Sequence, residues 1–247
     1  MSDASITPAR YDAVLFDLDG VLTDTAALHA KAWKTMFDEF LRRYSLAHDL
    51  PYQAFEIATD YRSYVDGRPR YEGVSAFLES RRIVLPLGNM DDSPREDTTY
   101  GLGNRKNEMV QELIDAGVEP YPSSVQLVDR LLAEGIKCAI VSSSRNARRV
   151  LEAAGIADRF ELVVDGEVAR EAELAGKPAP DTFLEAARRL GAEPERTVVI
   201  EDAVAGVEAG KGGGFGLVIG VDRLDQADDL RAHGADVVVA DLDELLA

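Results

Sequence analysis

The sequence of 247 residues is poor in several residues that mark whole classes of protein. It has a single cysteine, Cys138, so a disulfide within the chain is impossible, and its apolar neighbours predict a packed thiol in a reducing compartment. No apolar run has the length of a membrane span, and the polar residues 1–5 do not resemble the start of a signal peptide. We therefore expect a cytoplasmic protein with no membrane partner.

Basic side chains are also scarce. Lys and Arg number 27 against 45 Asp and Glu, a formal net charge of −18 at pH 7, and the basic residues form no stripe that could follow a nucleic-acid backbone. We therefore expect no nucleic acid as a partner. An anionic substrate would need a few locally placed cations in order to bind. The hydrophobic content of 46% suits one large domain, or a core with a smaller inserted domain.

Short apolar runs alternate with amphipathic helical patterns along most of the chain. The apolar runs are 13–16, 139–141, 162–164, 198–200, 217–219 and 237–239, and the clearest helical patterns between them are 125–133, 147–154 and 182–190. Strands that alternate with helices indicate βαβ crossovers and a parallel sheet. The sequence therefore predicts an α/β fold with a Rossmann-like, doubly wound core.

A long helical stretch interrupts this alternation. Residues 26–116 show helical periodicity and no strong strand, which predicts a helical domain inserted between core segments 1–25 and 117–247. Within it we expect helices at 28–44, 76–80 and 109–114. Residues 93–96 read Ser-Pro-Arg-Glu, a capping box that predicts a short helix inside the loop 86–104. The glycines 212–214 are expected to end a helix rather than to bind phosphate.

Two aspartates, Asp17 and Asp19, directly follow the first predicted strand. Two carboxylates at one strand end are costly unless something cationic holds them. A divalent metal and a phosphoryl group would do so, with one carboxylate as nucleophile and the other as proton donor. The alternative is a strand followed by an ordinary Asp-Gly turn.

Other strand ends carry side chains that suit the same chemistry. Ser142 can donate to a phosphoryl oxygen, and Lys177, on a turn with two prolines, can neutralise both a nucleophile and a phosphoryl group. Glu201 and Asp202 can complete the oxygen coordination of Mg²⁺. Each could alone be a helix cap or a surface residue. Their occurrence in order at successive strand ends instead indicates Mg²⁺-dependent phosphoryl transfer.

These four segments also resemble the motifs of a known family. The motifs are DLDGVLTD at 17–24, the strand end at Ser142, Lys177 in KPAPD, and Glu201-Asp202. Together they resemble the haloacid dehalogenase superfamily of phosphotransferases, and the resemblance covers nearly the whole chain. It implies that Asp17 becomes an aspartyl phosphate and that Asp19 is the general acid/base.

The resemblance also implies a metal site. In the family's pattern Mg²⁺ would be held by Asp17, the backbone carbonyl of Asp19 and Asp202, with Glu201 in or beside the coordination shell. The aspartate at position 19 favours phosphate esters over dehalogenation, because an alkoxide leaving group needs a proton and a halide does not.

The inserted domain looks like the cap of the β-phosphoglucomutase subgroup. Residues 23–26 followed by His29 and Trp33 resemble the run into the first cap helix of that subgroup, which implies that His29 helps to position Asp19. Residues 66–73, with Gly67 and Arg70, resemble the cap loop whose arginine clamps the distal phosphate of the substrate. The alternative is that His29 and Trp33 are ordinary core residues and that Arg70 is an ordinary surface residue.

Lys106, just before the last expected cap helix, resembles the lysine of the subgroup that touches the sugar phosphate. The residues expected to bind substrate are thus His29, Gly67, Arg70, Lys106, Ser142, Ser143, Arg145 and Asn146. The cations among them would supply the local positive charge that the acidic composition otherwise lacks.

Two phosphate sites are what a phosphosugar mutase needs. The resemblance implies interconversion of β-glucose 1-phosphate and glucose 6-phosphate through glucose 1,6-bisphosphate, which would act as activator and intermediate. The partner would be a small phosphorylated sugar, and a monomer is expected. A Mg²⁺-dependent phosphatase for a small sugar phosphate would use the same residues, and the sequence separates the two poorly. A signalling module that only binds phosphate is disfavoured, since it has little use for Asp19 or for a large insertion.

Overall fold

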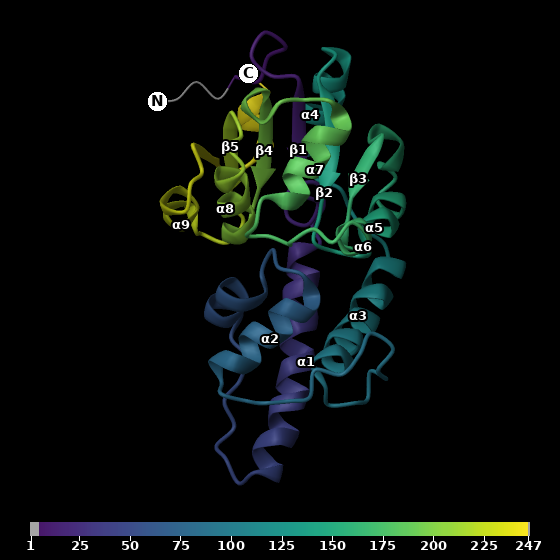
Figure 1. Ribbon diagram of the computed structural model, residues 1–247, viewed down its shortest axis with the longest axis vertical. Coiled ribbons are helices and arrows are strands. Elements are labelled where there is room, and N and C mark those ends of the chain that lie inside the picture. Colours follow the sequence, from purple (N-terminus) through teal and green to yellow (C-terminus); the bar gives the residue numbers. More distant parts are fainter. Residues whose placement is uncertain (1–4, 247) are drawn as a thin grey trace. The chain divides into compact units, whose positions relative to one another are not determined.

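The structure is a computed structural model that describes residues 5–246 (Figure 1). The chain divides into two compact units. Unit 1 is formed by Met1–Thr25 and Gly117–Ala247, and unit 2 is formed by Ala26–Ala116.

Unit 1 is built on one parallel sheet of six strands in the order β3-β2-β1-β4-β5-β6. The strands are β1 (Ala13–Phe16), β2 (Lys137–Val141), β3 (Leu162–Val164), β4 (Thr197–Glu201), β5 (Leu217–Val221) and β6 (Val237–Val239). The central strand β1 lies between β2 and β4, with Ala13 opposite both Lys137 and Thr197. This order is that of a doubly wound Rossmann-like sheet, so the predicted fold class is confirmed.

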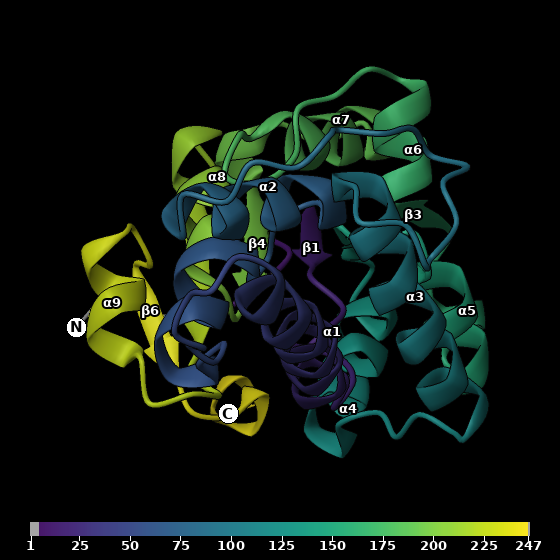
Figure 2. The same cartoon turned by 90° about the horizontal axis from the view of Figure 1, so that it is seen from below.

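Helices cover both faces of this sheet. They are α4 (Pro122–Ala133), α5 (Ala147–Ala153), α6 (Gly166–Glu171), α7 (Asp181–Leu190), α8 (Val204–Gly212) and α9 (Ala227–Ala232), with 3-10 turns at Ala157–Arg159, Pro194–Arg196 and Leu242–Leu245. Figure 2 shows α7 and α8 on one side of β1 and β4, and α4 on the other. Helix α8 ends at Gly212 with Gly213 as its cap, which confirms the expected role of the glycine run.

Within residues 5–246, no helix combines the length and the apolar character needed to cross a membrane.

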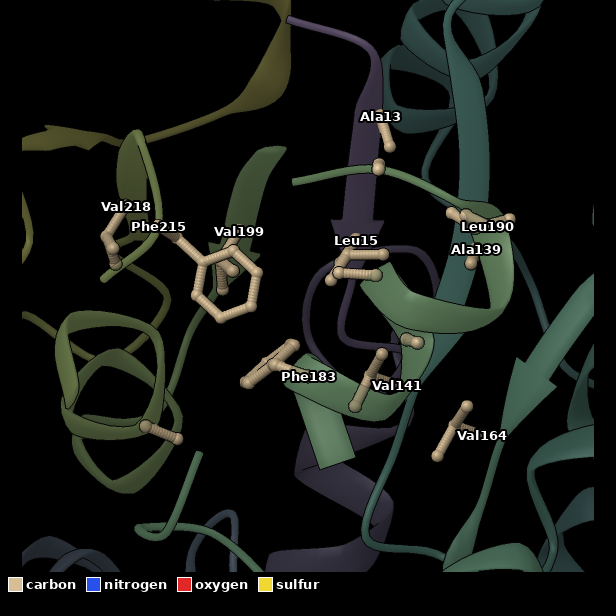
Figure 3. Packing of buried hydrophobic residues seen from close by; sticks show 14 of the residues in the cluster. Ala13, Leu15, Ala139, Val141, Val164, Phe183, Leu190, Val199, Phe215 and Val218 are labelled. Atoms are coloured by element: carbon tan, nitrogen blue, oxygen red, sulfur yellow. The ribbon is translucent and has the colours of Figure 1, made fainter. Parts of the chain in front are cut away.

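The core of unit 1 lies between the sheet and helix α7 (Figure 3). Leu15 and Val199 are fully buried, as expected for strands covered on both faces. Phe183 from α7 packs against this cluster and meets Phe215 edge to face, with ring centroids 6.1 Å apart. Burial of one such ring contributes about 1.5–3 kcal/mol, which fixes α7, and the segment before it, against the sheet.

Unit 2 is helical, with α1 (Ala26–Ala47), a π-helix at Ile57–Val65, α2 (Arg70–Ser80) and α3 (Thr99–Asp115). Its core contains an aromatic cluster in which the ring of Phe37 lies 5.3 Å from Trp33, 5.1 Å from Phe55 and 4.2 Å from Phe77. Unit 2 therefore has a hydrophobic core of its own.

The short helix predicted at 93–96 is absent, although cap-like contacts form there: the Ser93 amide donates to Glu96 Oε1 and the Arg95 amide donates to Ser93 Oγ, both at 3.3 Å. Ser93 and Glu96 form a turn, in which the Glu96 amide donates to the Ser93 carbonyl at 2.9 Å. The helix begins later, at Thr99, where the Oγ1 of Thr98 caps it by accepting from the amide of Gly101 at 2.9 Å. Gly101 and Gly103, in the first two turns of α3, weaken the helical pattern of the sequence there. Lys106 consequently lies within α3 and not before it.

The two connections between the units are paired with each other inside unit 1. Thr23 and Pro120 form an antiparallel bridge, the amide of Asp24 donates to the carbonyl of Glu119, and the amide of Tyr121 donates to that of Leu22. The Tyr121 hydroxyl also donates to Asp24 Oδ1 at 3.0 Å. The outgoing and returning segments are thus joined before the chain enters unit 2.

Cys138 offers a test of the packing around the sheet. It lies on β2 and is buried, and burial raises the pKa of its thiol to about 12. Because the thiolate is the reactive form, the native protein should react with a disulfide reagent such as DTNB much more slowly than the unfolded protein, which should titrate one thiol per chain. Rapid stoichiometric reaction of the native protein near neutral pH would contradict this packing.

Candidate active site

The candidate site begins with acidic side chains at the carboxyl ends of two neighbouring strands. Asp17 directly follows β1, and Glu201 is the last residue of β4. The parallel pairing continues past Phe16, since the amide of Asp17 donates to the carbonyl of Ile200 at 2.9 Å. Both side chains are buried, so their charges must be compensated within the protein.

Lys177 supplies this compensation. Its ammonium donates to Asp17 Oδ1 at 2.6 Å, to Glu201 Oε1 at 2.6 Å and to the carbonyl of Val141 at 2.9 Å. These three bonds use every N–H of the group, and only 1% of the side chain is exposed. The ring of Phe183 lies 4.9 Å from the nitrogen. One ammonium thereby joins the ends of β1, β2 and β4.

The charges in this cluster alter each other's protonation. Burial raises the pKa of Asp17 to about 6 and that of Glu201 to about 7, although the nearby Lys177 ammonium acts to lower both. Burial alone would lower the pKa of Lys177, but the two carboxylates outweigh it and hold that pKa above its ordinary value. The lysine is therefore charged at neutral pH.

Glu201 is held on both of its oxygens. Oε1 accepts from Lys177, and Oε2 accepts from the amide of Ala203 at 3.0 Å. Helix α8 passes so close that a Cβ on Gly206 would lie 1.8 Å from Glu201 Oε1. Gly206 is thus required for α8 to pack over this carboxylate.

Three carboxylates could hold a cation together. Asp17, Glu201 and Asp202 are buried and offer oxygen atoms that all lie within 4.8 Å of one another. When ionised they carry three negative charges against the single positive charge of Lys177, so a divalent cation would balance the group. Carboxylate oxygens are also the ligands that Mg²⁺ prefers. The residues therefore fit the metal that the sequence led us to expect.

Asp19 has different surroundings from Asp17. Its Oδ1 accepts a hydrogen bond from the Thr25 hydroxyl, and the Oγ1 atoms of Thr23 and Thr25 lie 2.9 Å apart. The turn after Asp19 requires glycine, because Gly20 has a φ of 88° and a Cβ there would lie 1.9 Å from Asp202 Oδ2. Asp19 is not one of the three clustered carboxylates, but Gly20, the next residue, packs against the Asp202 carboxylate.

The loop after β2 carries the next set of expected residues, Ser142 to Asn146. Ser142 is buried, and its Oγ accepts from the amide of Ser144 at 3.1 Å, while the Ser144 Oγ accepts from the amide of Asn146 at 3.1 Å. Arg145 forms an ion pair with Glu167, so its charge is already compensated. Ser143 lies in the same loop, which leads into the first turn of α5.

Unit 2 contains the remaining expected residues. Lys106 is buried, with its nitrogen 3.2 Å from His29 Nδ1 and 4.9 Å from the centre of the Trp33 ring. Arg70, the first residue of α2, donates to Asn107 Oδ1 at 2.6 Å. Burial, and then the charges of Lys106 and Arg70, hold the pKa of His29 well below its ordinary value. His29 is therefore neutral at pH 7, and two cations lie near it.

Gly67 precedes this group in the chain. It has a φ of 67°, which is favourable for glycine, and it lies in the turn between the π-helix and α2. The turn directs the chain toward Arg70.

Three further residues contact the site of unit 1 and were missed in the sequence. They are Thr25, which binds Asp19, Arg223, which donates to the Gly20 carbonyl at 2.8 Å, and Gln226, which donates to the Asp202 carbonyl at 2.8 Å. Arg223 and Gln226 follow the strand end of β5, so examination of this strand end as well as the others would have found them.

Comparisons with known proteins agree with this geometry. A family model for haloacid dehalogenase-like hydrolases matches residues 11–214. The chain is 50% identical over 244 residues to a β-phosphoglucomutase of Mycobacterium bovis, across 97% of this chain and 93% of the relative. It is 33% identical to a fructose-1-phosphate phosphatase of Escherichia coli, across 85% of this chain and 96% of the relative.

A solved structure supports the same assignment. The crystal structure of a β-phosphoglucomutase from Clostridium difficile matches with a TM-score of 0.73 at 28% identity, across 95% of this chain and 93% of the other. The expectation of a phosphoryl-transfer enzyme is confirmed, and the chain belongs to the haloacid dehalogenase-like hydrolase family.

Proposed function

We propose that the protein is a Mg²⁺-dependent phosphosugar mutase that interconverts β-glucose 1-phosphate and glucose 6-phosphate. The observation that carries this proposal is the 50% identity, over 97% of the chain, to a β-phosphoglucomutase. The geometry of unit 1 supports it, because Asp17, Lys177 and Asp202 lie together in a buried acidic group.

In this proposal Asp17 is the nucleophile and becomes an aspartyl phosphate. Lys177 holds Asp17 Oδ1 and keeps the carboxylate ionised and oriented. Asp17, Asp202 and the backbone carbonyl of Asp19 would hold Mg²⁺, which when bound neutralises charge on the phosphoryl oxygens. Glu201, with both oxygens engaged, is assigned a place beside the metal shell. Ser142 is assigned as a donor to a phosphoryl oxygen.

Asp19 is proposed as the general acid/base. As the phosphoryl group passes from Asp17 to a sugar hydroxyl, Asp19 takes up the hydroxyl proton, which produces glucose 1,6-bisphosphate. In the second half-reaction Asp17 accepts the other phosphoryl group, and Asp19 returns the proton to the departing sugar oxygen. The Thr25 hydroxyl orients the Asp19 side chain, which carries the proton between these steps.

The cations of unit 2 are assigned to the distal phosphate of the sugar. Arg70 and Lys106 provide positive charge, and the guanidinium of Arg70 suits bidentate binding of a phosphate. His29 is neutral and hydrogen bonds to Lys106, so it orients the ammonium without adding charge. Gly67 provides the turn before Arg70.

A phosphatase for a small sugar phosphate is the second candidate. It is favoured by the 33% identity to a fructose-1-phosphate phosphatase, across 96% of that relative. The same residues would serve, with water instead of a sugar hydroxyl attacking the aspartyl phosphate.

A single assay separates the two functions. With Mg²⁺, β-glucose 1-phosphate and a trace of glucose 1,6-bisphosphate, we expect glucose 6-phosphate to exceed free phosphate by far, because the phosphoryl group is returned to sugar. Both products are measured in the same sample. Free phosphate that matches the loss of substrate would instead establish the phosphatase. Asp17→Asn should abolish both products, since an amide cannot form the aspartyl phosphate.

Replacement of Lys177 by methionine should destabilise unit 1. Lys177→Met retains the volume and removes the charge, which leaves two buried carboxylates unpaired, at an expected loss of about 3–5 kcal/mol in the free energy of unfolding near neutral pH. Burial raises the pKa of Asp17 to about 6 and that of Glu201 to about 7, and loss of the ammonium would raise both further, so this penalty should grow as the pH rises above about 6. Urea denaturation with EDTA at about pH 5 and about pH 8 measures it, and a smaller loss at the higher pH would contradict the assignment.

Arg70→Ala should impair the use of sugar phosphates more than that of a small aryl phosphate. The loss of a charge-assisted contact predicts a roughly 10- to 100-fold decrease in kcat/KM for β-glucose 1-phosphate. Hydrolysis of p-nitrophenyl phosphate, which lacks a distal group, should change little. Arg43→Ala is the matched control, since Arg43 is an exposed residue of α1 that pairs with Asp97. Equal losses on both substrates would exclude a clamp role for Arg70.

A further inference from the structure

The turn that follows β5, residues 222–226, contacts both loops that carry the acidic residues of unit 1. Gln226 is buried, and its Nε2 donates to the backbone carbonyl of Asp202 at 2.8 Å. Its own amide donates to Asp222 Oδ1 at 2.8 Å, which closes the turn. Gln226 thereby connects the end of β5 to the loop after β4.

Arg223 makes the second connection. Its Nε donates to the Gly20 carbonyl at 2.8 Å, and its Nη1 donates to Asp241 Oδ2 at 3.1 Å. The guanidinium carbon lies 3.9 Å from the centre of the Tyr121 ring, and 15% of the side chain is exposed. A hydrogen bond and a stacked ring hold this arginine in one orientation, so it can fix the position of the loop that contains Gly20.

The two loops that this turn holds are in direct contact. A Cβ on Gly20 would lie 1.9 Å from Asp202 Oδ2, so the Asp202 carboxylate rests on the backbone that follows Asp19. A shift of either backbone would therefore move Asp202 relative to Asp17. Residues that orient ligand groups from outside the coordination shell commonly change metal affinity or activity 10- to 100-fold when replaced.

We propose that the 222–226 turn sets the position of the metal-binding groups, with Gln226 and Arg223 as positioning residues. Gln226 fixes the loop of Asp202, and Arg223 fixes the backbone of Gly20, next to the Asp19 carbonyl. This inference rests on the proposed Mg²⁺-dependent function. It assigns a role to the 222–226 turn, whose side chains donate to the backbone of the Gly20 and Asp202 loops.

The test is Mg²⁺ binding measured by isothermal titration calorimetry with magnesium chloride. Gln226→Met has a similar volume and the same net charge but lacks the donor, so we expect about tenfold weaker binding or more. The kcat should recover toward the wild-type value at saturating Mg²⁺, because the catalytic groups themselves are intact. Gln126→Met, at an exposed position of α4, is the matched control and should bind Mg²⁺ as the wild type does.

Arg223→Lys tests the second residue. Lysine retains the positive charge but lacks the planar fork, so a role that depends on charge alone predicts wild-type affinity, whereas a positioning role predicts weaker binding. Arg231→Lys is the control, since Arg231 is an exposed residue of α9 that pairs with Asp228. Wild-type affinity in Arg223→Lys would overturn its positioning role.

The outcomes separate this inference from the function on which it rests. A wild-type protein that binds no Mg²⁺ would overturn both. A wild type that binds Mg²⁺, together with a folded Gln226→Met variant of equal affinity, would overturn the inference alone. Thermal unfolding verifies that the variants fold. If Gln226→Met does not fold, Gln226→Asn replaces it, because the shorter amide cannot reach the Asp202 carbonyl. Weaker Mg²⁺ binding by this variant would support the inference, and wild-type affinity would overturn it.

Discussion

The fold of unit 1 depends on one buried ammonium group. Lys177 binds the carboxylates of Asp17 and Glu201 and the carbonyl of Val141, and these three groups end three adjacent strands. Without the lysine, the buried carboxylates would repel each other across β1 and β4. With it, each carboxylate lies 2.6 Å from a shared, buried cation. The packing of Phe183 against the sheet fixes the segment that delivers the lysine. Stability and the proposed reactivity thus involve the same contacts.

The sequence was sufficient to predict the sheet and its acidic edge. The strands of a doubly wound sheet are buried on both faces, so they appear as short continuous apolar runs such as 13–16. The chemistry follows directly after these runs, and Asp17, Ser142 and Glu201 could be placed without knowledge of the strand order. Although 160 residues separate Lys177 from Asp17, their clustering could be expected from the order of the strand ends, the opposite charges and the resemblance of KPAPD to a family motif.

Other parts of the site could not be predicted because their contacts leave no local pattern. The position of Arg223 after β5 marks it as a candidate, but its partner could not be predicted, because Arg223 lies 203 residues from Gly20, whose carbonyl it binds. The ion pair of Arg145 with Glu167 is hidden for the same reason. The error at the start of α3 has another cause. Residues 93–96 make the side-chain contacts of a helix cap around a turn, while Gly101 and Gly103 weaken the helical pattern where the helix does begin.

The pairing of Thr23 with Pro120 has a consequence for how this fold can diversify. The segments that flank the insertion pair with each other within unit 1, so residues 26–116 form a loop whose two ends are held together by the core. The entropy cost of closing a loop grows only with the logarithm of its length, by about 0.6 kcal/mol for each doubling. The core can therefore accept insertions of very different size at this point for a nearly constant cost. Because the proposed contacts with the distal phosphate lie in the insertion, substrate range can change there while the acidic edge of the sheet stays as it is.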